Sequence, residues 1–459
     1  MMNNDGMTPL EQKAAYSLAS IFMLRMLGLF MILPVFSLYA EELEGSTPLL
    51  IGLAVGMYGL TQAILQIPFG MLSDRIGRKP VIIAGLIIFA IGSAVAATAD
   101  TAIGVVIGRA IQGAGAIAAT IMALAADLTR EEHRLKAMAV IGISIGVSFS
   151  VALIAGPILN SWIGVAGIFW LTAILAIGGI AVVKYVVPDP VKSSFHRDAE
   201  PVPAQFKAIL GDRQLLRLDF GIFSLHMILT ATFVILPLAL RDHAGLEVGS
   251  HWLIYLAVMV ISMAVMVPFI IYAEKKRRMK QVFVGSVVFI GVAQLCLAWG
   301  YTSVTGIVVS LLIFFIAFNV LEASLPSLIS KTAPPDKKGT AMGVYSSSQF
   351  FGAFIGGVSG GWLYGEFGIA SVFMFSAVVA FLWFLLAVTM SEPKYLGTYM
   401  IKLGEINEEK ASLLATQLNQ ITGVAEVVVV AEDGVAYLKV DNKIVDKTEL
   451  EKFSVAEPA

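Results

Sequence analysis

Twelve long apolar segments are the feature that most constrains the fold of this chain. A helix that crosses a membrane needs about 20 predominantly apolar residues. Of the 459 residues, 58% are hydrophobic and only 14% are charged, whereas a soluble domain carries about 25% charged residues. We therefore predict an all-α polytopic membrane protein. The expected transmembrane helices are 16–39, 48–72, 80–97, 102–125, 135–159, 164–187, 216–240, 251–273, 281–299, 303–329, 340–363 and 368–389.

The start of the chain has the pattern of a helix entry rather than of a cleavable signal peptide. Thr8 is the expected N-cap, Pro9 falls in the first turn, and Glu11 stands where it would complete a capping box.

The distribution of Lys and Arg between the short loops predicts the orientation in the membrane. The loop after the seventh segment holds Arg241, and the loop after the first is acidic, with Glu41, Glu42 and Glu44. The loops after the even-numbered segments carry the basic residues Arg75, Arg78, Lys79, Arg130, Arg134, Lys136, Lys275, Lys276, Arg277, Arg278, Lys280, Lys331, Lys337 and Lys338. Since short loops rich in Lys and Arg stay in the cytoplasm, we expect both termini on the cytoplasmic side of a bacterial-type inner membrane.

The segments divide into two related sets of six. A polar stretch with four prolines separates them at 188–215, so the expected units are halves at 1–187 and 216–392. The stretch QIPFGMLSDRIGRKP at 66–80 has a counterpart 200 residues later, MVPFIIYAEKKRRMK at 266–280. Duplicated halves around a central site are a known plan of transporters.

The loop between the second and third segments carries a motif. The fourth segment carries a second motif, IGRAIQGAGA, with Arg109, Gln112 and Gly113. The loop residues fit the pattern G-x-x-x-D-R-x-G-R-[RK] with Gly70, Asp74, Arg75, Gly77, Arg78 and Lys79. With both motifs, the chain resembles the major facilitator superfamily, and with its soluble tail it is most similar to the YajR-type family of drug efflux transporters. Helix 5 departs from the antiporter pattern, because only Gly156-Pro157 fits it, and helix 1 holds no Asp or Glu.

The resemblance implies a conformational latch at this loop. Asp74 would contact the start of helix 11 near Gly339–Thr340, and Arg78 would contact Asp127 at the end of helix 4, so that the cytoplasmic mouth closes in the outward-open state. Glycines allow a tight, closely packed loop, and a carboxylate is stabilised beside a helix N-terminus. The alternative is that the loop only anchors the topology through its positive charge.

Several polar residues lie inside the segments, where they are costly and so become functional candidates. Arg25 in helix 1 and Glu322 in helix 10 lie about 13 Å and about 10 Å from their cytoplasmic ends. The resemblance places helices 1, 4, 7 and 10 around a cavity, so that the two side chains could face each other and couple transport to protons. Alternatively, Arg25 extends to the membrane surface and Glu322 only packs near it.

Four further side chains are candidates for substrate binding or proton coupling. Arg109 could instead tie helices together through backbone carbonyls, and His226 could titrate near neutral pH or serve as a packing residue. Gln112 and Asn319 offer neutral hydrogen bonds to a ligand or to other helices.

The last part of the chain, 396–459, is polar and predicts a small cytoplasmic domain. Its order is a strand at TYMIKL, a helix, a hairpin turning at Glu432-Asp433-Gly434 and a short helix within 446–453. This β-α-β-β-α order is that of a ferredoxin-like module without a visible fourth strand. The loop LGEIN holds no cysteine or histidine, so we expect no metal site there. The domain could regulate transport, mediate self-association or only add cytosolic surface.

These features favour a secondary transporter that exports small amphipathic organic compounds in exchange for protons. We find no phosphate-binding loop, catalytic triad or metal cluster, and the single cysteine is Cys296, so we expect no enzyme, no cofactor, no metal and no nucleic-acid partner. An uncoupled facilitator and a ligand sensor that signals through the tail are the alternatives.

Overall fold

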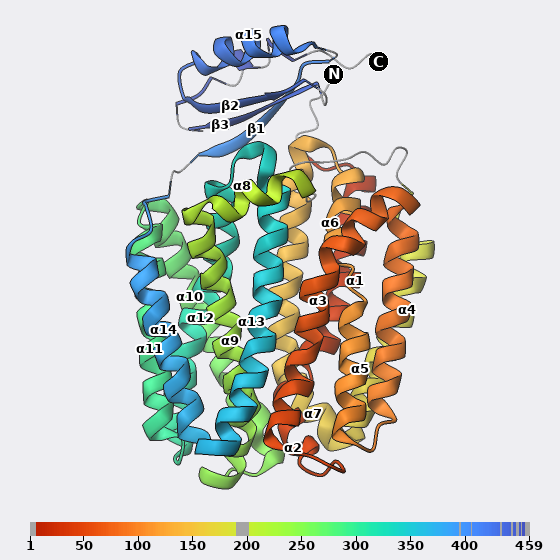
Figure 1. The fold of residues 1–459 in the computed structure, drawn as a ribbon, viewed down its shortest axis with the longest axis vertical. Helices are drawn as coiled ribbons and strands as arrows, with labels where there is room; N and C mark the ends of the chain where they lie inside the picture. Colours follow the sequence, from red (N-terminus) through yellow and green to blue (C-terminus); the bar gives the residue numbers. More distant parts are fainter. Residues whose placement is uncertain are drawn as a thin grey trace.

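Helices bundled side by side form the body of the protein, and a small three-stranded sheet covers one end of the bundle (Figure 1). We call that end the tail side. The structure is a computed structural model that describes residues 6–189, 202–393, 396–404, 406–431, 434–441, 444–446, 449–450 and 452–454. The first turn of α1 lies at the tail side as well, because Thr8 and tail residues such as Tyr399 line the mouth of the same cavity.

The N-terminal half contains the first six predicted spans. The expected capping box is present, since Thr8 Oγ1 accepts from the Glu11 backbone and the Glu11 carboxylate accepts from Thr8 N at 2.7 Å. The helices of this half are α1 (Pro9–Phe30), α2 (Phe36–Ala40), α3 (Pro48–Ile76), α4 (Arg78–Ala97), α5 (Ala102–Ala114), α6 (Ala118–Asp127) and α7 (Glu131–Tyr185).

The C-terminal half contains the other six. Its elements are a 3-10 turn (Pro203–Gln205), α8 (Phe206–Gly211), α9 (Arg213–Leu238), a π turn (Ala239–His243), a 3-10 turn (Val248–Ser250), α10 (His251–Lys275), α11 (Met279–Gly300), α12 (Val304–Thr332), a 3-10 turn (Pro335–Lys337), α13 (Lys338–Phe367) and α14 (Ile369–Val388). The first of these turns and α8 belong to the predicted linker 188–215, of which residues 190–201 lie outside the described chain.

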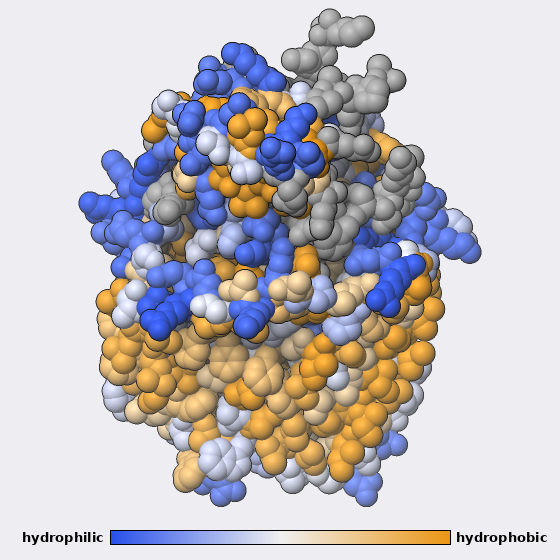
Figure 2. All heavy atoms as spheres, turned by 45° about the horizontal axis from the view of Figure 1, so that its top comes forward, coloured by the Kyte–Doolittle hydropathy of each residue, from blue (hydrophilic) through white to orange (hydrophobic). Residues whose placement is uncertain are grey.

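Ten stretches of the described chain are long and apolar enough to cross a membrane. One of them, within α7, contains two spans, because the chain reverses direction at Gly164, whose φ of 66° suits a residue without a side chain. The thirty-residue α13 packs along α3 and α9 and crosses the bundle beside them. The predicted twelve-helix fold is thus confirmed. On the face seen in Figure 2, apolar side chains cover a broad band of the body below the polar tail side.

The packing repeats between the halves. In the first half α1 packs along α7 and α4 packs on α5, and in the second half α9 packs along α13 and α11 packs on α12. Helices at equivalent positions in each half thus make equivalent contacts, as a duplicated six-helix unit requires. Two spans were predicted as unbroken helices but contain breaks, at 31–35 between α1 and α2 and at 115–117 between α5 and α6.

The tail folds as β1 (Gly397–Lys402), α15 (Glu408–Asn419), β2 (Val424–Val430) and β3 (Val435–Val440). The sheet has the order β1-β3-β2 with antiparallel pairs, so the predicted β-α-β-β order is confirmed. Side chains such as Ile401, Leu418 and Leu438 form its core. Glu432 and Asp433 of the predicted turn, and parts of the predicted helix at 446–453, lie outside the described residues.

The other face of the sheet is turned to the bundle. Lys439 is buried, and its ammonium donates to the carbonyls of Lys331 at 2.9 Å and Thr332 at 3.4 Å, which end α12. Asp441 Oδ2 lies 3.6 Å from Arg277 Nη2 in the turn before α11. These contacts hold the tail against the C-terminal half.

Candidate functional site

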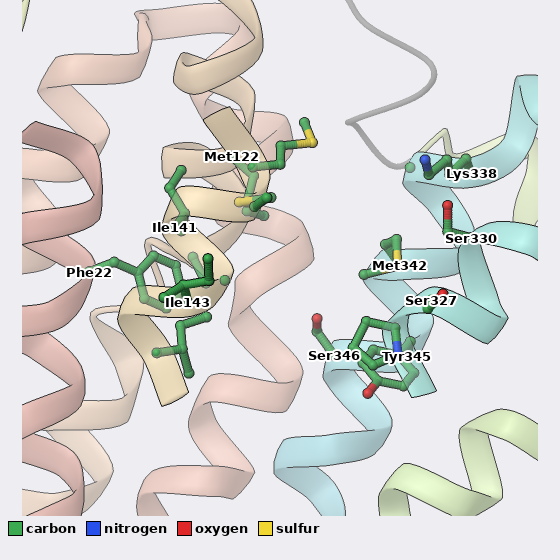
Figure 3. Close-up of a pocket in the computed structure, with 18 of the residues that line it drawn as sticks. Phe22, Met122, Ile141, Ile143, Ser327, Ser330, Lys338, Met342, Tyr345 and Ser346 are labelled. Carbon is green, nitrogen blue, oxygen red and sulfur yellow. The ribbon is translucent and has the colours of Figure 1, made fainter. Parts of the chain in front are cut away.

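A cavity of about 2680 Å³ lies between the two halves. Its lining runs from Leu33 and Phe149 deep in the bundle to Lys338 at the start of α13 and to Tyr437 of the tail, so the cavity opens toward the tail side. Figure 3 shows its two walls near the opening. Apolar side chains on the N-terminal half, Phe22, Met122, Ile141 and Ile143, face a wall from α12 and α13 that holds Ser327, Ser330, Lys338, Met342, Tyr345 and Ser346.

The opposite end of the bundle is closed. Gly52 and Gly56 of α3 meet Gly357 of α13 so closely that a Cβ added at Gly357 would lie 2.9 Å from the Gly56 backbone. Beyond this contact, Arg241 Nη2 lies 2.7 Å from Glu41 Oε2, which joins the π turn of one half to the residue after α2 of the other. Within the described residues, the cavity therefore opens toward the tail side, and these contacts between the halves close the opposite end.

Arg25 is buried inside the N-terminal half. Its Nη2 donates to Tyr58 Oη at 2.6 Å and to Gln62 Oε1, while its Nε and Nη1 have no hydrogen-bond partner. The guanidinium lies 5.8 Å from the centre of the Tyr58 ring, a distance typical of cation–π contacts. Arg25 is only 2% exposed, so it does not extend to the membrane surface.

Arg109 approaches the same tyrosine, with its guanidinium 5.1 Å from the Tyr58 ring centre. It donates from Nε to the Ala54 carbonyl at 3.2 Å and from Nη1 to Gln112 Oε1 at 2.6 Å. Gln112 in turn donates to Ser93 Oγ at 2.7 Å, which fixes its amide. Arg109 is fully buried, yet its Nη2 has no partner and the residue lines the cavity. The structural tie to backbone therefore uses only part of this side chain.

Titratable side chains meet on the facing wall. His226 Nε2 of α9 lies 3.8 Å from Glu322 Oε2 of α12, and Gln349 Nε2 of α13 lies 2.8 Å from His226 Nε2 and 3.4 Å from Glu322 Oε1. Glu322 is 32% exposed because it faces the cavity. Asn319, one turn earlier on α12, donates to Ser262 Oγ at 3.1 Å and also lines the cavity.

The expected pairing of Arg25 with Glu322 across the cavity is not present. Arg25 bonds within its own half and Glu322 contacts His226 and Gln349 within the other. Asp219 of α9 also differs from expectation. Its position near the end of a predicted span favours a solvated side chain, but it is buried and neither carboxylate oxygen has a hydrogen-bond partner. Its burial follows from the central place of α9, which α12, α13 and α14 surround.

The loop motif forms a compact network at the tail side. Arg78 is buried and contacts Asp74, Ser73 Oγ at 2.7 Å and Asp127 Oδ2 at 3.2 Å. The expected contact between Arg78 and Asp127 is therefore made. Gly77 takes φ 97° between α3 and α4, a conformation that favours glycine.

Other members of the motif hold the loop against its surroundings. A Cβ at Gly70 would lie 3.3 Å from the Ala119 side chain of α6, so this glycine allows close packing. Lys79 Nζ donates to the Val187 carbonyl at 2.7 Å and lies 2.6 Å from Asp189 Oδ1. Arg75 is exposed in the last turn of α3.

The predicted helix 11 is α13, and its start contacts residues other than Asp74 in this conformation. Thr340 Oγ1 donates to Gln205 Oε1 at 2.8 Å and accepts from Val202 N at 2.8 Å. Asp74 is one-third exposed and bonds to Arg78. The expected contact between Asp74 and the start of α13 is thus not made here, where the cavity is open at the tail side.

One tail-side contact was missed by the sequence reasoning. The Glu11 carboxylate accepts from the Arg130 guanidinium at 3.0 Å and 3.1 Å and from the Arg130 backbone at 2.8 Å. It therefore joins the start of α1 to the turn before α7. The capping box already gave Glu11 a role in the sequence, and nothing nearby indicated a second one.

Sequence comparisons agree with this architecture. The family profile of the Major Facilitator Superfamily matches residues 18–357 and 274–399, and that of the YajR YAM domain matches 401–455. The chain is 48% identical over 451 residues to the inner membrane transport protein YajR of Escherichia coli (strain K12), covering 98% of this chain and 99% of that protein. It is 25% identical to the multidrug resistance protein MdtH of Aeromonas salmonicida (strain A449), over 74% of this chain and 85% of that protein.

Solved structures share the fold of the bundle. A bacterial homolog of the human lysosomal transporter Spinster, in an inward-facing and occupied conformation, superposes with a TM-score of 0.67 at 14% identity, over 84% of this chain and 98% of that one. The human organic anion transporter MFSD10 (TETRAN) superposes with a TM-score of 0.61 at 19% identity, over 83% of this chain and all of that one. The twelve-helix fold, the loop motif and the matching relatives together show that this chain is a multi-pass membrane protein of the Major Facilitator Superfamily, a family of transporters and not of enzymes.

Proposed function

We propose that the protein is a proton-coupled secondary transporter that exports small amphipathic organic compounds by alternating access. The cavity supports this proposal, because it is large enough for a small organic molecule, is mostly lined by apolar side chains, and reaches from the middle of the bundle to the tail side. The same wall holds a carboxylate and an imidazole within 3.8 Å of each other. That pair is the observation on which proton coupling rests.

Glu322 is the proposed proton carrier. It is exposed to the cavity and so can exchange protons with the side on which the cavity is open. Its contacts with His226 and Gln349 give the proton a second acceptor and a neutral hydrogen-bond partner. An ionisable side chain in a membrane span is a functional candidate by default, and a change of its charge would alter how the two halves meet. Asn319 would orient substrate beside it.

The loop 70–79 would act as the latch that closes the tail side. We propose that Arg78 and Asp127 hold the loop in both conformations, and that Asp74 reaches the start of α13 when the tail side closes. Gly70 lets the loop pack closely, Gly77 adopts the positive φ of the turn, and Lys79 holds the loop through the Val187 carbonyl. A contact of this kind is worth about 1–2 kcal/mol, which biases two conformations without locking either.

We also propose how the chain is oriented in the membrane and how it divides into units. Both termini would lie in the cytoplasm of an inner membrane, because the basic loops face the tail side. The units would be two six-helix halves, 1–187 and 216–392, with the linker 188–215 and the tail 396–459. We propose that the tail regulates transport or mediates self-association.

Transport in proteoliposomes tests the coupling. A panel of fluorescent amphipathic dyes is offered to wild-type protein and to Glu322→Gln, with and without an imposed pH gradient. We expect wild type to move dye uphill when the gradient is present, and Glu322→Gln to equilibrate dye without accumulating it. His226→Asn serves as the comparison, because it removes the imidazole and keeps the carboxylate.

Two outcomes would change the proposal. Accumulation by Glu322→Gln but not by His226→Asn would make His226 the carrier. Dye movement by wild type that ignores the pH gradient would indicate an uncoupled facilitator.

A further inference from the structure

Two buried guanidinium groups in the N-terminal half have no carboxylate partner among the described residues. Arg25 and Arg109 lie 5.8 Å and 5.1 Å from the centre of the Tyr58 ring, and their hydrogen bonds go to the neutral groups of Tyr58, Gln62, Ala54 and Gln112. Neither takes part in an ion pair within the described chain. A buried charge is expensive unless it is paired, so two such charges beside each other need an explanation outside the local packing.

The hydrogen-bonding capacity of this cluster is incompletely used. Arg25 Nε and Nη1, Arg109 Nη2 and Gln62 Nε2 are buried donors that have no partner. Buried polar groups of native proteins are nearly always hydrogen-bonded, and an exception calls for a reason. Arg109 and Tyr58 border the cavity although they are 0% and 1% exposed, so a bound molecule would reach the cluster when neighbouring side chains shift to admit it.

The carboxylates that line the cavity in the described chain are engaged elsewhere. Glu11 bonds to Arg130, Asp127 to Arg78, and Glu322 lies beside His226 and Gln349 on the other half. The lining is also cationic overall, with these three carboxylates set against Arg109, Arg130, Arg134, Lys136, Lys331 and Lys338. A cleft lined by one sign of charge concentrates ions of the opposite sign.

We propose that the substrate carries an anionic group, a carboxylate, sulfonate or phosphate, and that Arg109 and Tyr58, with Arg25 behind them, form its binding site. Arg109 Nη2 supplies a charge-assisted hydrogen bond. Arg25 contributes charge and fixes the Tyr58 hydroxyl, and Gln112 orients Arg109 from the far side. The apolar side chains around Phe22 and Met26 would contact the rest of the substrate. This inference deepens the proposed function, because it names the substrate class of the same cavity.

Binding of matched probes tests the assignment separately from transport. The full-length protein in nanodiscs is titrated at constant ionic strength with naphthalene-2-carboxylate, naphthalene-2-sulfonate and 2-naphthyl phosphate, and with the neutral 2-naphthamide and the cationic 2-naphthylmethylammonium. The shift in Tm gives the apparent affinity of each. We expect at least one anionic probe to bind more tightly than both the neutral and the cationic probe.

Variants locate the preference. Arg109→Gln should weaken binding of the anionic probe by about tenfold or more, since a hydrogen bond to a charged group is worth about 1.5–3 kcal/mol and 1.4 kcal/mol is tenfold. Arg25→Gln should also weaken it, because it removes a nearby charge and the hydrogen bond that fixes the Tyr58 hydroxyl. Arg109→Lys should retain part of the preference because it keeps the charge. Lys136→Gln is the matched control, because it removes one positive charge from the exposed mouth of the same cavity. If Arg109→Gln does not fold, Tyr58→Phe provides the test with the ring retained.

The outcomes separate the possible explanations. An anionic preference that Lys136→Gln keeps and Arg109→Gln loses supports the site. No anionic preference in wild type, or one that survives in both arginine variants, overturns it. If the arginines only hold helices together, the variants lose stability without probe and keep the preference. Probe binding without dye transport would count against the proposed function and leave the anion site standing.

Discussion

The glycine contact between α3 and α13 allows a sharp test of how the halves move. Gly357 meets the backbone of Gly56 across the interface, and a Cβ there would lie 2.9 Å from its Cα and its backbone nitrogen. Neighbouring Gly356 instead faces Met227 of its own half, where a Cβ would lie 2.8 Å from the Met227 Cα. Gly357→Ala therefore crowds the contact between halves, and Gly356→Ala crowds a contact within one half.

The expected size of the effect follows from the crowding. Overpacking a close contact costs about 1–3 kcal/mol. The proposed alternating access requires the halves to separate at this interface when the closed end opens. On that proposal, Gly357→Ala destabilises only the observed conformation. A bias of this size changes the ratio of two conformations by about 5- to 150-fold. Gly356→Ala costs a similar amount in both conformations and should leave their ratio unchanged.

Cysteine labelling measures the ratio. In a Cys296→Ser background, which removes the exposed native thiol, single cysteines replace Ser327 in the tail-side cavity wall and Ser37, which is fully buried on α2. Gly357→Ala should slow labelling at position 327 and speed it at position 37, while Gly356→Ala changes neither. Faster labelling at 327 in Gly357→Ala, or equal effects of both variants, would refute the interpretation of this interface as a closed gate.

Three other predictions concern the ends of the bundle. Asp74→Asn should raise labelling of a cysteine at Ser327, because the tail-side closed state loses its latch; unchanged labelling would leave the loop as a topology anchor. Arg241→Gln should weaken closure of the α2 end by about 0.2–1 kcal/mol, as for an exposed ion pair, and a Glu41→Gln change added to it should have no further effect in the same labelling assay. Deleting 396–459 should leave a monodisperse twelve-helix core in size-exclusion chromatography, and precipitation would show that the tail is needed for stability.

Span positions could be predicted because the bilayer imposes a length and a composition on every crossing helix. The helix breaks at 31–35 and 115–117 could not, since the residues there are as apolar as those around them and only Pro34 and Gly115 differ locally. Hydropathy reports burial from water and is insensitive to whether the buried backbone is helical.

The candidate site was predicted less completely. Position along a helix follows from counting residues, and Arg25 and Glu322 lie within α1 and α12, away from the helix ends. The direction in which each points depends on packing, which one sequence does not give, and so the Arg25–Tyr58 and Glu322–His226 contacts were not foreseen. The burial of Asp219 was not expected, because its position near the end of a span favours a solvated side chain and nothing in the sequence marks α9 as a central helix.

The attachment of the tail has a consequence for measuring motion. Lys439 and Asp441 fix the sheet to the end of α12 and to the turn before α11, both in the C-terminal half. The sheet would then tilt with that half as one rigid body. A fluorophore on the exposed face of α15, paired with one near Glu11 on the other half, would convert a small rotation deep in the membrane into a larger change of distance in water. A rotation of the C-terminal half would thus displace the tail further than it displaces the helices of that half.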